Sequence, residues 1–473
     1  MDLNQLTLEE AAEGLRKKKF SSVELTQNCL DKIQEKEKNI FSFLKVTAEK
    51  ALAQAKEADQ VLAEGGEESK LAGIPLAVKD NILLKDVSCT AGSRILENYT
   101  APYDATVISR LKKRKAVFLG KTNLDEFAMG SSTENSAFQV THNPYDLKRV
   151  PGGSSGGSAA AVGSGEAIYS LGSETGGSVR QPASFCGLVG LKTTYGSVSR
   201  YGLIALASSL DQIGPITKTV GDSRLVFQAI SGPDKKDATS RQKENFSSFS
   251  LKSLKVGLIK DELLQSVDPL IVKRIKRVVD ELKGKGAKVK TIDFPNLLSA
   301  LPTYYIIVPA EASANLARYD GIKYGKSATA SDLEKVYRLT RGEGFGPEVK
   351  RRIILGTFVL SAGYAEAYYK RALKIKRLIV KELEKAFQEV DVIISPTTPT
   401  LPFKIGEKTQ DPVQMYLSDL LTVPANLAGL PALTVPVGTI QELPVGLQIM
   451  APAFQEERLF QVGEEIEKLA SFI

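Results

Sequence analysis

The chain has 473 residues, of which 42% are hydrophobic and 25% are charged, a balance typical of a globular protein. Its net charge of +7 is mild, and the short basic runs at 112–115 and 350–352 are typical of solvated helix faces rather than of a nucleic-acid surface. The sequence has no run of 18 apolar residues, no signal-like start and only three widely spaced cysteines, so we expect a cytoplasmic protein that does not contact a membrane.

The motif Ser/Thr-x-x-Glu occurs twice near the N-terminus, at residues 7–10 and 21–24. In this capping box, the two side chains satisfy backbone N–H groups that a helix leaves free at its start. The motifs predict two helices, the second of which reaches about Glu37, and a third helix is expected at 46–62. Residues 1–62 are therefore predicted to form a helical layer that precedes the first strand.

Further along the chain, apolar runs of strand length alternate with segments of helix length. This alternation predicts an α/β fold with one mixed central sheet and helices on both faces. Residues 71–231 would form its core, the polar stretch 232–253 a surface excursion, and residues 254–473 the remainder of the same sheet and helices. The predicted strands are 74–78, 116–119, 255–259, 288–294 and 390–394, and the predicted helices are 105–115, 268–283, 362–387 and 456–470.

The segment from Gly152 to Ser178 contains nine glycines and seven serines in 27 positions. Glycine lets the backbone approach a ligand closely, and serine supplies a hydroxyl that can act as a nucleophile or as a proton relay. Two such clusters, at 152–158 and 173–178, flank an alanine-rich stretch with helical character, which a flexible linker would lack. The segment therefore indicates a site where two hydroxyls and several backbone N–H groups meet.

Several well-known sites do not fit this segment. Residues 152–156 match the G-x-S-x-G elbow of α/β-hydrolases, but that fold needs a histidine after the serine, and the single histidine, His142, precedes it. His142 lies in a Thr-His-Asn-Pro segment typical of a solvated loop, although a histidine-first serine-protease order stays open. One histidine and three cysteines are too few for a Cys- or His-rich zinc site, and the Gly-Lys-Thr at 120–122 lacks the first glycine of a P-loop.

A site with two serines and no suitable histidine needs another base, and lysine can serve. The apolar strand that begins near Ile74 leads directly into Lys79. Burial at the inner end of a strand would lower the pKa of a lysine amine from about 10.4 toward the range of a working base. A lysine at a strand end is more often a surface residue. The double-serine segment nevertheless makes Lys79 the candidate base.

These residues carry a resemblance to a known family. The segments GIPLAVKDNI (73–82), GGSSGGSAAAV (152–162) and SLGSETGGSVRQPASFCGLVGLKTTYG (170–196) are similar to the signature of the amidase signature family. Further similar segments, such as DEFAMGSSTENSAF (125–138), extend the resemblance over nearly the whole chain. The resemblance implies a single large amidase domain, 1–473, and acyl transfer from amides by a Ser–cis-Ser–Lys triad.

The resemblance also implies roles for the catalytic residues. Ser178 is expected to attack a carboxamide and to carry the acyl group, Ser154 to relay the proton, and Lys79 to act as a neutral base. A cis peptide bond is expected between Gly153 and Ser154. The oxyanion hole is expected at a run of four residues that can present consecutive backbone N–H groups. These are Thr175, Gly176, Gly177 and Ser178.

Within the family, the outlying segments are most similar to the glutamine-hydrolysing subunits of tRNA-dependent amidotransferases. This similarity implies that Arg352 binds the α-carboxylate of glutamine, that Asp419 binds its α-amino group, and that Tyr304 adds a contact. Arginine suits a carboxylate because it can donate two parallel hydrogen bonds.

The same similarity implies partners. Ammonia from glutamine would pass to a B subunit, which uses ATP and Mg²⁺ to amidate Glu-tRNA(Gln), and a small C subunit would complete a heterotrimer. No cofactor or metal is expected in this chain, and tRNA would be bound mainly through the B subunit. Two alternatives stay open: a stand-alone amidase that acts on aryl or aliphatic amides, and a scaffold that keeps the fold without the chemistry.

Overall fold

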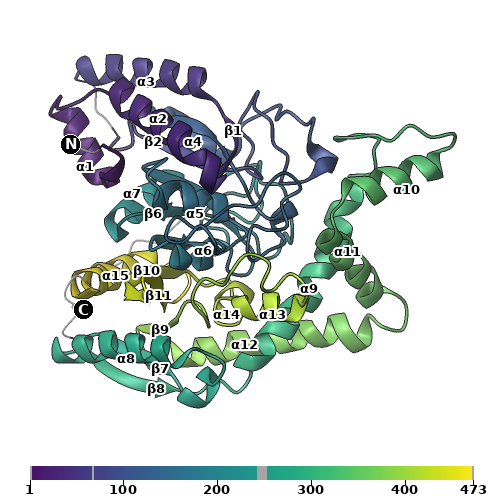
Figure 1. Ribbon diagram of the computed structural model, residues 1–473. Coiled ribbons are helices and arrows are strands. Elements are labelled where there is room, and N and C mark those ends of the chain that lie inside the picture. Colours follow the sequence, from purple (N-terminus) through teal and green to yellow (C-terminus); the bar gives the residue numbers. More distant parts are fainter. Residues whose placement is uncertain (1–2, 66–68, 242–252, 471–473) are drawn as a thin grey trace.

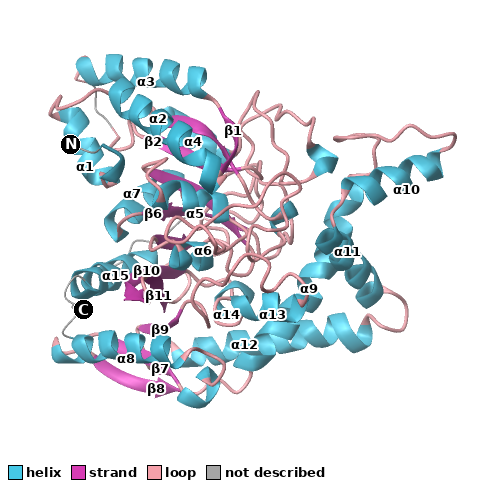
Figure 2. Cartoon of the chain, in the orientation of Figure 1, coloured by secondary structure: helices cyan, strands magenta, loops and turns pink. Residues whose placement is uncertain are grey.

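One mixed β-sheet of eleven strands runs through the part of the chain that the computed structural model describes, residues 3–65, 69–241 and 253–470 (Figures 1 and 2). This sheet confirms the predicted mixed α/β fold. Residues 242–252 of the predicted polar excursion lie outside the described residues. The strands are β1 (Phe43–Val46), β2 (Pro75–Lys79), β3 (Val117–Thr122), β4 (Tyr169–Glu174), β5 (Val189–Lys192), β6 (Gln212–Thr217), β7 (Lys255–Ile259), β8 (Lys288–Ile292), β9 (Val392–Pro396), β10 (Ala432–Ile440) and β11 (Leu443–Met450).

The sheet order, β1-β3-β2-β4-β6-β5-β10-β11-β9-β7-β8, places β2 and β4 next to each other in its interior. β2 pairs in parallel with both β3 and β4. The five successive pairs between β4 and β9 in this order, β4-β6, β6-β5, β5-β10, β10-β11 and β11-β9, are antiparallel. β7 is parallel to both β9 and β8. Every residue of β2, β3 and β4 is buried. The carboxyl ends of the parallel strands β2 and β4 therefore open at the same edge of the sheet.

The helices begin where local signals predict them near the N-terminus. Thr7 and Ser21 each accept a hydrogen bond at 3.1 Å from the backbone N–H three residues later, so both predicted capping boxes are confirmed. The helices are α1 (Leu8–Arg16), α2 (Ser22–Ile40), α3 (Ala48–Ala63), α4 (Thr106–Lys113), α5 (Gly156–Gly163), α6 (Arg180–Phe185), α7 (Val220–Ile230), α8 (Pro269–Gly284), α9 (Ala300–Asn315), α10 (Leu333–Gly344), α11 (Pro347–Leu360), α12 (Arg371–Ala386), α13 (Pro412–Tyr416), α14 (Val423–Leu427) and α15 (Glu456–Ala470).

Two helix predictions need correction. The helix expected at 46–62 starts only at Ala48, because the residues before it form strand β1, which pairs antiparallel with β3 at the edge of the sheet. The helix expected at 362–387 starts at Arg371 and follows a π-helical turn, Glu366–Lys370. Gly363 has a φ of 84°, a left-handed conformation that an α-helix does not contain, so a continuous helix from residue 362 was wrong.

Helices α9 to α12 lie beside the sheet-bearing body, and α10 and α11 extend away from it (Figure 1). α9 and α11 approach very closely, because a Cβ atom on Gly356 of α11 would overlap the Pro309 carbonyl of α9. Both helices contribute side chains to the site described below. None of the helices in the described ranges is long and apolar enough to cross a membrane.

Candidate active site

The structure brings Lys79, at the end of β2, into contact with the serine-rich segment. Lys79 Nζ lies 2.8 Å from Ser154 Oγ, 2.8 Å from Ser155 Oγ and 3.0 Å from the Ser173 carbonyl oxygen. The Lys79 side chain is fully buried. The parallel pairing of β2 with β4 creates this arrangement, because it aligns the strand ends that carry Lys79 and Ser173.

Burial allows Lys79 to lose its proton near neutral pH. Removal of the amine from water disfavours its charged form and lowers the pKa of Lys79 to about 7, although the carboxylates of Asp125, Asp211 and Glu174 act in the opposite direction. A lysine with an ordinary pKa would be almost wholly protonated at neutral pH and could not accept a proton. The environment of Lys79 therefore suits a base that works in its neutral form.

The peptide bond between Gly153 and Ser154 is cis, as predicted. Beside it lies the loop after β3, which the Asp125 carboxylate holds by accepting backbone hydrogen bonds from Ser132 at 3.2 Å and Thr133 at 2.8 Å. A Cβ atom on Gly153 would lie only 2.7 Å from the Ser132 nitrogen, so this position requires glycine. Asp125 was missed by the sequence reasoning, although it begins one of the segments that carry the family resemblance.

The turn that follows β4 presents free donors. The backbone N–H groups of all four predicted residues, Thr175, Gly176, Gly177 and Ser178, donate to no other residue in the described part of the chain, and the Ser178 hydroxyl likewise has no partner there. Ser178 keeps 8% of its surface exposed, whereas Ser154 and Ser155 are fully buried. Of the three hydroxyls, Ser178 is thus the one that a substrate can reach, beside N–H groups able to bind an oxyanion.

Buried carboxylates hold this turn from both sides. Asp211 accepts a 2.6 Å hydrogen bond from Thr175 Oγ1, and Glu174 accepts backbone hydrogen bonds from Val179 and Arg180 at 3.0 and 3.1 Å. The Arg180 side chain also forms a fully buried ion pair with Glu174. Such paired and hydrogen-bonded charges fix the backbone, because breaking any one of them would leave a buried charge uncompensated.

Asp419 and Tyr304, the predicted glutamine-binding residues, lie next to the same turn. A Cβ atom on Gly177 would lie 2.9 Å from Asp419 Oδ1, and one on Gly176 would lie 2.6 Å from the Tyr304 hydroxyl. Asp419 Oδ2 accepts from Ser131 at 2.7 Å, whereas its buried Oδ1 has no partner within the described ranges. Burial raises the pKa of Asp419 to about 6. Oδ1 is therefore available to a cationic group of a ligand.

Arg352, the third predicted residue, projects from α11 into an aromatic clamp. Its guanidinium carbon lies 5.1 Å from the centre of the Tyr305 ring and 5.2 Å from that of Tyr416. Its Nε donates to Glu348 at 2.7 Å, and its Nη2 donates to the Gly130 carbonyl at 3.2 Å. Both Arg352 and Asp419 are thus anchored on the loop after β3, through Gly130 and Ser131. Sequence reasoning did not predict these anchors or either tyrosine of the clamp, Tyr305 and Tyr416.

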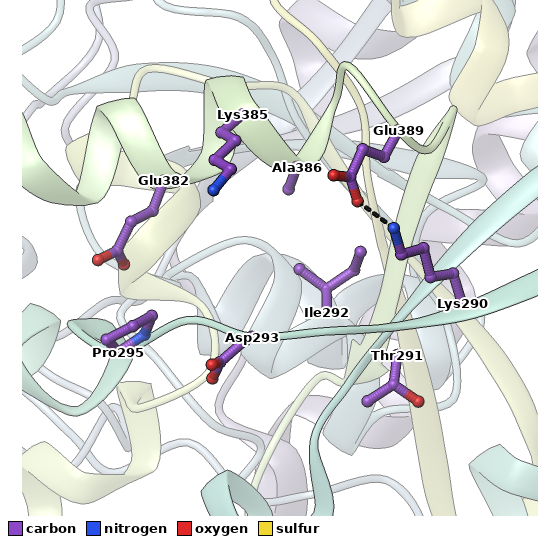
Figure 3. Close-up of a pocket in the computed structure, with 9 residues that line it drawn as sticks. All are labelled: Lys290, Thr291, Ile292, Asp293, Pro295, Glu382, Lys385, Ala386 and Glu389. Atoms are coloured by element: carbon purple, nitrogen blue, oxygen red, sulfur yellow. Dashed lines mark hydrogen bonds and ion pairs between the residues drawn. The ribbon is translucent and has the colours of Figure 1, made fainter.

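Figure 3 shows a different pocket, between β8 and α12, which contains none of the predicted site residues. An ion pair between Lys290 and Glu389 crosses one end of it. No group of three His, Cys, Asp or Glu side chains in the described segments is placed to hold a metal ion. The residues that the sequence predicts to be catalytic or substrate-binding therefore lie around the turn after β4 and not in this pocket.

Known proteins resemble this chain over its full length. The amidase family model matches residues 24–460. The A subunit of the glutamyl-tRNA(Gln) amidotransferase of Cyanothece sp. is 53% identical, with 98% of this chain and 97% of that protein covered. A crystal structure of the corresponding A subunit from Thermotoga maritima is 43% identical with a TM-score of 0.81, covering 99% and 95%. The peptide amidase of Stenotrophomonas maltophilia is 28% identical with a TM-score of 0.81, covering 99% and 97%.

The site predicts how activity depends on pH. The rate of amide hydrolysis, measured as kcat/KM, should rise with pH and level off above about 7, because Lys79 accepts a proton only when neutral. Lys79→Arg should lower kcat by about 100-fold or more, since arginine stays protonated.

Burial also raises the pKa of the neighbouring Asp125 to about 7, so the group that titrates must be identified. The pKa of an amine falls on warming, whereas that of a carboxyl group barely moves. The pH profile should therefore be recorded at several temperatures. A profile that is flat between pH 5 and 9, or a midpoint that does not shift with temperature, would contradict the assignment to Lys79.

Proposed function

The chain belongs to the amidase family, and we propose that it is the A subunit of a glutamyl-tRNA(Gln) amidotransferase, the subunit that releases ammonia from glutamine for conversion of Glu-tRNA(Gln) to Gln-tRNA(Gln). The observation that carries this proposal is the contact of the buried Lys79 with Ser154, 2.8 Å away, beside a turn of free N–H donors flanked by Tyr304 and Asp419. The 53% identity to the Cyanothece sp. protein over 469 residues supports the same function.

The hydrogen bonds of Lys79 support a direction for proton transfer. Ser155 donates its own hydrogen to the Ser173 carbonyl at 3.0 Å, so the Ser155 oxygen can only accept from Lys79. The Ser173 carbonyl can likewise only accept. A neutral amine has two hydrogens and one lone pair. These two acceptors take both hydrogens, and the lone pair of Lys79 is left facing the Ser154 hydroxyl.

The proposed reaction then proceeds in two halves. Ser178 Oγ attacks the carboxamide carbon of glutamine while its proton passes to Ser154 and that of Ser154 passes to Lys79. The C–N bond of the tetrahedral intermediate breaks while the proton held by Lys79 passes through Ser154 to the leaving nitrogen, which departs as ammonia. Water attacks the acyl-Ser178 ester with the same proton transfers and releases glutamate. The N–H groups of the turn Thr175, Gly176, Gly177 and Ser178 stabilise both oxyanions.

The pocket residues favour glutamine over a simple amide. Free glutamine carries a carboxylate and an ammonium group, and the site offers a buried arginine and a buried carboxylate oxygen without a partner in the described part of the chain. Arg352 binds the carboxylate of glutamine and Asp419 Oδ1 binds its ammonium group. Tyr304 adds a contact to the bound glutamine. The stand-alone amidase, the second candidate, is supported by the structural similarity to the peptide amidase, but its substrates need no such pair of charges.

Ammonia chemistry implies partners for this protein. Ammonia is mostly protonated in neutral water and then no longer nucleophilic, so it must be consumed without release. The proposed B subunit therefore docks on this chain and carries ATP and Mg²⁺, and a C subunit completes the complex. The N-terminal helices up to Leu62 are the proposed surface for the C subunit, and tRNA delivery places the assembly in the cytoplasm.

The nucleophile can be identified by trapping. A diazo-ketone analogue of glutamine should add one adduct to the peptide that contains Ser178, as detected by mass spectrometry, and Ser178→Ala should abolish glutaminase activity. Ser164→Ala is a suitable control, because Ser164 lies in the same segment but its hydroxyl bonds only Ala161 and Glu166. An adduct on Ser154 or Ser155 would contradict the proposed role of Ser178.

The contribution of the pocket's positive charge to glutamine binding can be measured with variants of two adjacent arginines. Arg352→Ala should raise KM for glutamine at least about tenfold, the cost of losing a hydrogen-bonded ionic contact, and should leave hydrolysis of an uncharged aryl amide within about threefold. Arg351→Ala is the control, because Arg351 also pairs with Glu348 but its side chain is 48% exposed. Equal losses on both substrates would remove Arg352 from the glutamine pocket.

The effect of the partner subunits on the rate of ammonia release distinguishes the amidotransferase subunit from the stand-alone amidase. The chain should co-purify with B and C subunits at equal stoichiometry, and its glutaminase rate should rise when Glu-tRNA(Gln) and ATP are added to the complex. The measurement is ammonia release with and without each component. A chain that stays monomeric beside both subunits, with high activity on unrelated amides, would support the stand-alone amidase instead.

A further inference from the structure

Gln181 is a fully buried glutamine that neither donates nor accepts a proton in the proposed reaction. It lies in the first turn of α6, three residues after Ser178. Its side-chain Oε1 accepts a hydrogen bond from the Gly153 N–H at 2.8 Å, and its Nε2 donates to the Ser131 carbonyl oxygen at 3.1 Å. Its backbone N–H donates to the Gly177 carbonyl at 2.8 Å. One residue therefore contacts the turn of the proposed nucleophile, the segment of the proposed relay and the loop after β3.

The two partners of the Gln181 side chain fix which end of its amide faces each of them. The Gly153 N–H can only donate, so an acceptor must face it, and the Ser131 carbonyl can only accept, so a donor must face it. A carboxylate would place an oxygen against the Ser131 carbonyl, and an apolar side chain would leave both buried groups without this partner. The fit is also tight, because a Cβ atom on Gly152 would lie 2.3 Å from Gln181 Oε1. The position therefore suits a primary amide.

Two hydrogen bonds fasten the segment that carries Ser154, one on each side of it. Before it, the Gly153 N–H donates to Gln181 Oε1. After it, the Ser155 N–H donates to the Ser178 carbonyl at 3.1 Å. The two acceptors lie within four residues of each other, at the end of the turn after β4 and the start of α6. The Gln181 amide thus helps to set how closely the proposed relay hydroxyl approaches the proposed nucleophile.

The other hydrogen bond of the amide reaches the proposed glutamine pocket. Ser131, whose carbonyl accepts from Gln181, donates from its own Oγ to Asp419 Oδ2 at 2.7 Å. The neighbouring Gly130 carbonyl accepts from Arg352 at 3.2 Å. Gln181 therefore holds the loop after β3 at the point where this loop holds both proposed substrate-binding charges. A misplacement of about 1 Å in such a site can cost about 100-fold in rate.

We propose that Gln181 is a positioning residue for amide hydrolysis, whose side-chain amide holds Ser154 against Ser178 and links both to the loop that holds Asp419. This inference rests on the proposed function, since it joins the proposed serine triad to the proposed glutamine pocket. Loss of the amide should lower kcat for every amide substrate and, in addition, raise KM for glutamine alone. A residue that only stabilised the fold would change the amount of folded enzyme but would not affect kcat and KM in this substrate-dependent way.

The first test is Gln181→Met, because methionine has a similar length and shape but no amide. The purified chain is assayed alone and with its B and C subunits. For glutamine and for an uncharged aryl amide, kcat should fall about tenfold or more, since the relay is misplaced. KM should rise about threefold or more for glutamine only, because the aryl amide has no ammonium group for Asp419.

Gln54→Met is the matched control for this variant. Gln54 lies on α3, and its Oε1 also accepts a backbone N–H, that of Phe118 at 2.9 Å. The control therefore loses the same kind of hydrogen bond at a place outside the proposed site. Its kcat and KM should stay within about twofold of wild type on both substrates, even where its melting temperature falls.

Gln181→Glu tests the hydrogen bonds separately from the shape of the side chain. A protonated carboxyl group can accept from the Gly153 N–H and donate to the Ser131 carbonyl, whereas the ionised form cannot donate. Burial favours the protonated form. The ratio of kcat in this variant to kcat in wild type should therefore rise about fivefold or more from pH 9 to pH 6. The same ratio for Gln181→Met should not change with pH.

The ratio removes the titration of other groups, because they are present in both enzymes. Charged or titratable side chains approach this position from each of the elements around it, through Ser154, Gly153, Ser131 and the start of α6. These side chains are Lys79, Asp125, Asp419 and the ion pair of Glu174 with Arg180.

The outcomes separate this inference from the proposed function. If wild type hydrolyses the aryl amide but not glutamine, the proposed function fails, and kcat on the aryl amide still tests Gln181. If Gln181→Met keeps kcat within twofold of wild type on both substrates, the inference is overturned. A ratio for Gln181→Glu that does not change with pH would also overturn it, and this second measurement decides the matter where Gln181→Met does not fold.

Discussion

The desolvation of one amine organises the site. Lys79 is fully buried at the end of β2, an interior strand of the sheet, and burial lowers its pKa to about 7 although three carboxylates favour its charged form. The amine is held by three oxygen atoms, two of which can only accept hydrogen bonds. A buried lysine in this setting is tolerable because it can exist as a neutral, fully hydrogen-bonded group. The same property that makes it compatible with the core suits it to the proposed role of base.

Close backbone approach is the second requirement, and glycine meets it. Gly153 lies against the Ser132 nitrogen, and Gly176 and Gly177 lie against Tyr304 and Asp419, at distances that leave no room for a Cβ atom. The glycines that leave N–H groups free at the proposed oxyanion hole therefore also bring Tyr304 and Asp419, the proposed substrate-binding residues, next to the proposed nucleophile Ser178. Catalytic and recognition geometry depend on the same two or three backbone positions.

The loop after β3 connects the parts of the site. Asp125 shapes the backbone next to Ser154, Glu126 holds the start of α11, Gly130 accepts from Arg352, and Ser131 donates to Asp419. Because all four contacts come from the seven residues 125–131, a displacement of α11 acts on both the pocket and the catalytic serines. This connection gives a physical route by which a movement of α11 can influence the proposed glutamine pocket.

The sequence by itself determined what depends on local pattern and residue chemistry. Capping boxes located α1 and α2, apolar runs located β2 and β7, and a serine- and glycine-rich segment without a usable histidine pointed to Lys79 as the base. The bounds of β7 and α15 agree with those predicted. The family resemblance, carried by short motifs, added roles for residues that no local pattern would have singled out, such as Arg352 and Asp419.

Only the tertiary structure decided which side chains hold Arg352 and Asp419 in place. Ser131 and Asp419 are 288 positions apart in the chain, and the clamp around Arg352 joins α9, α11 and α13. Strand β1 escaped prediction because four residues acquire their strand conformation from pairing with β3, more than seventy residues away. Periodicity and capping describe contacts within one turn or one strand. Contacts between distant segments leave no such signal, since they arise only when the sheet brings those segments together.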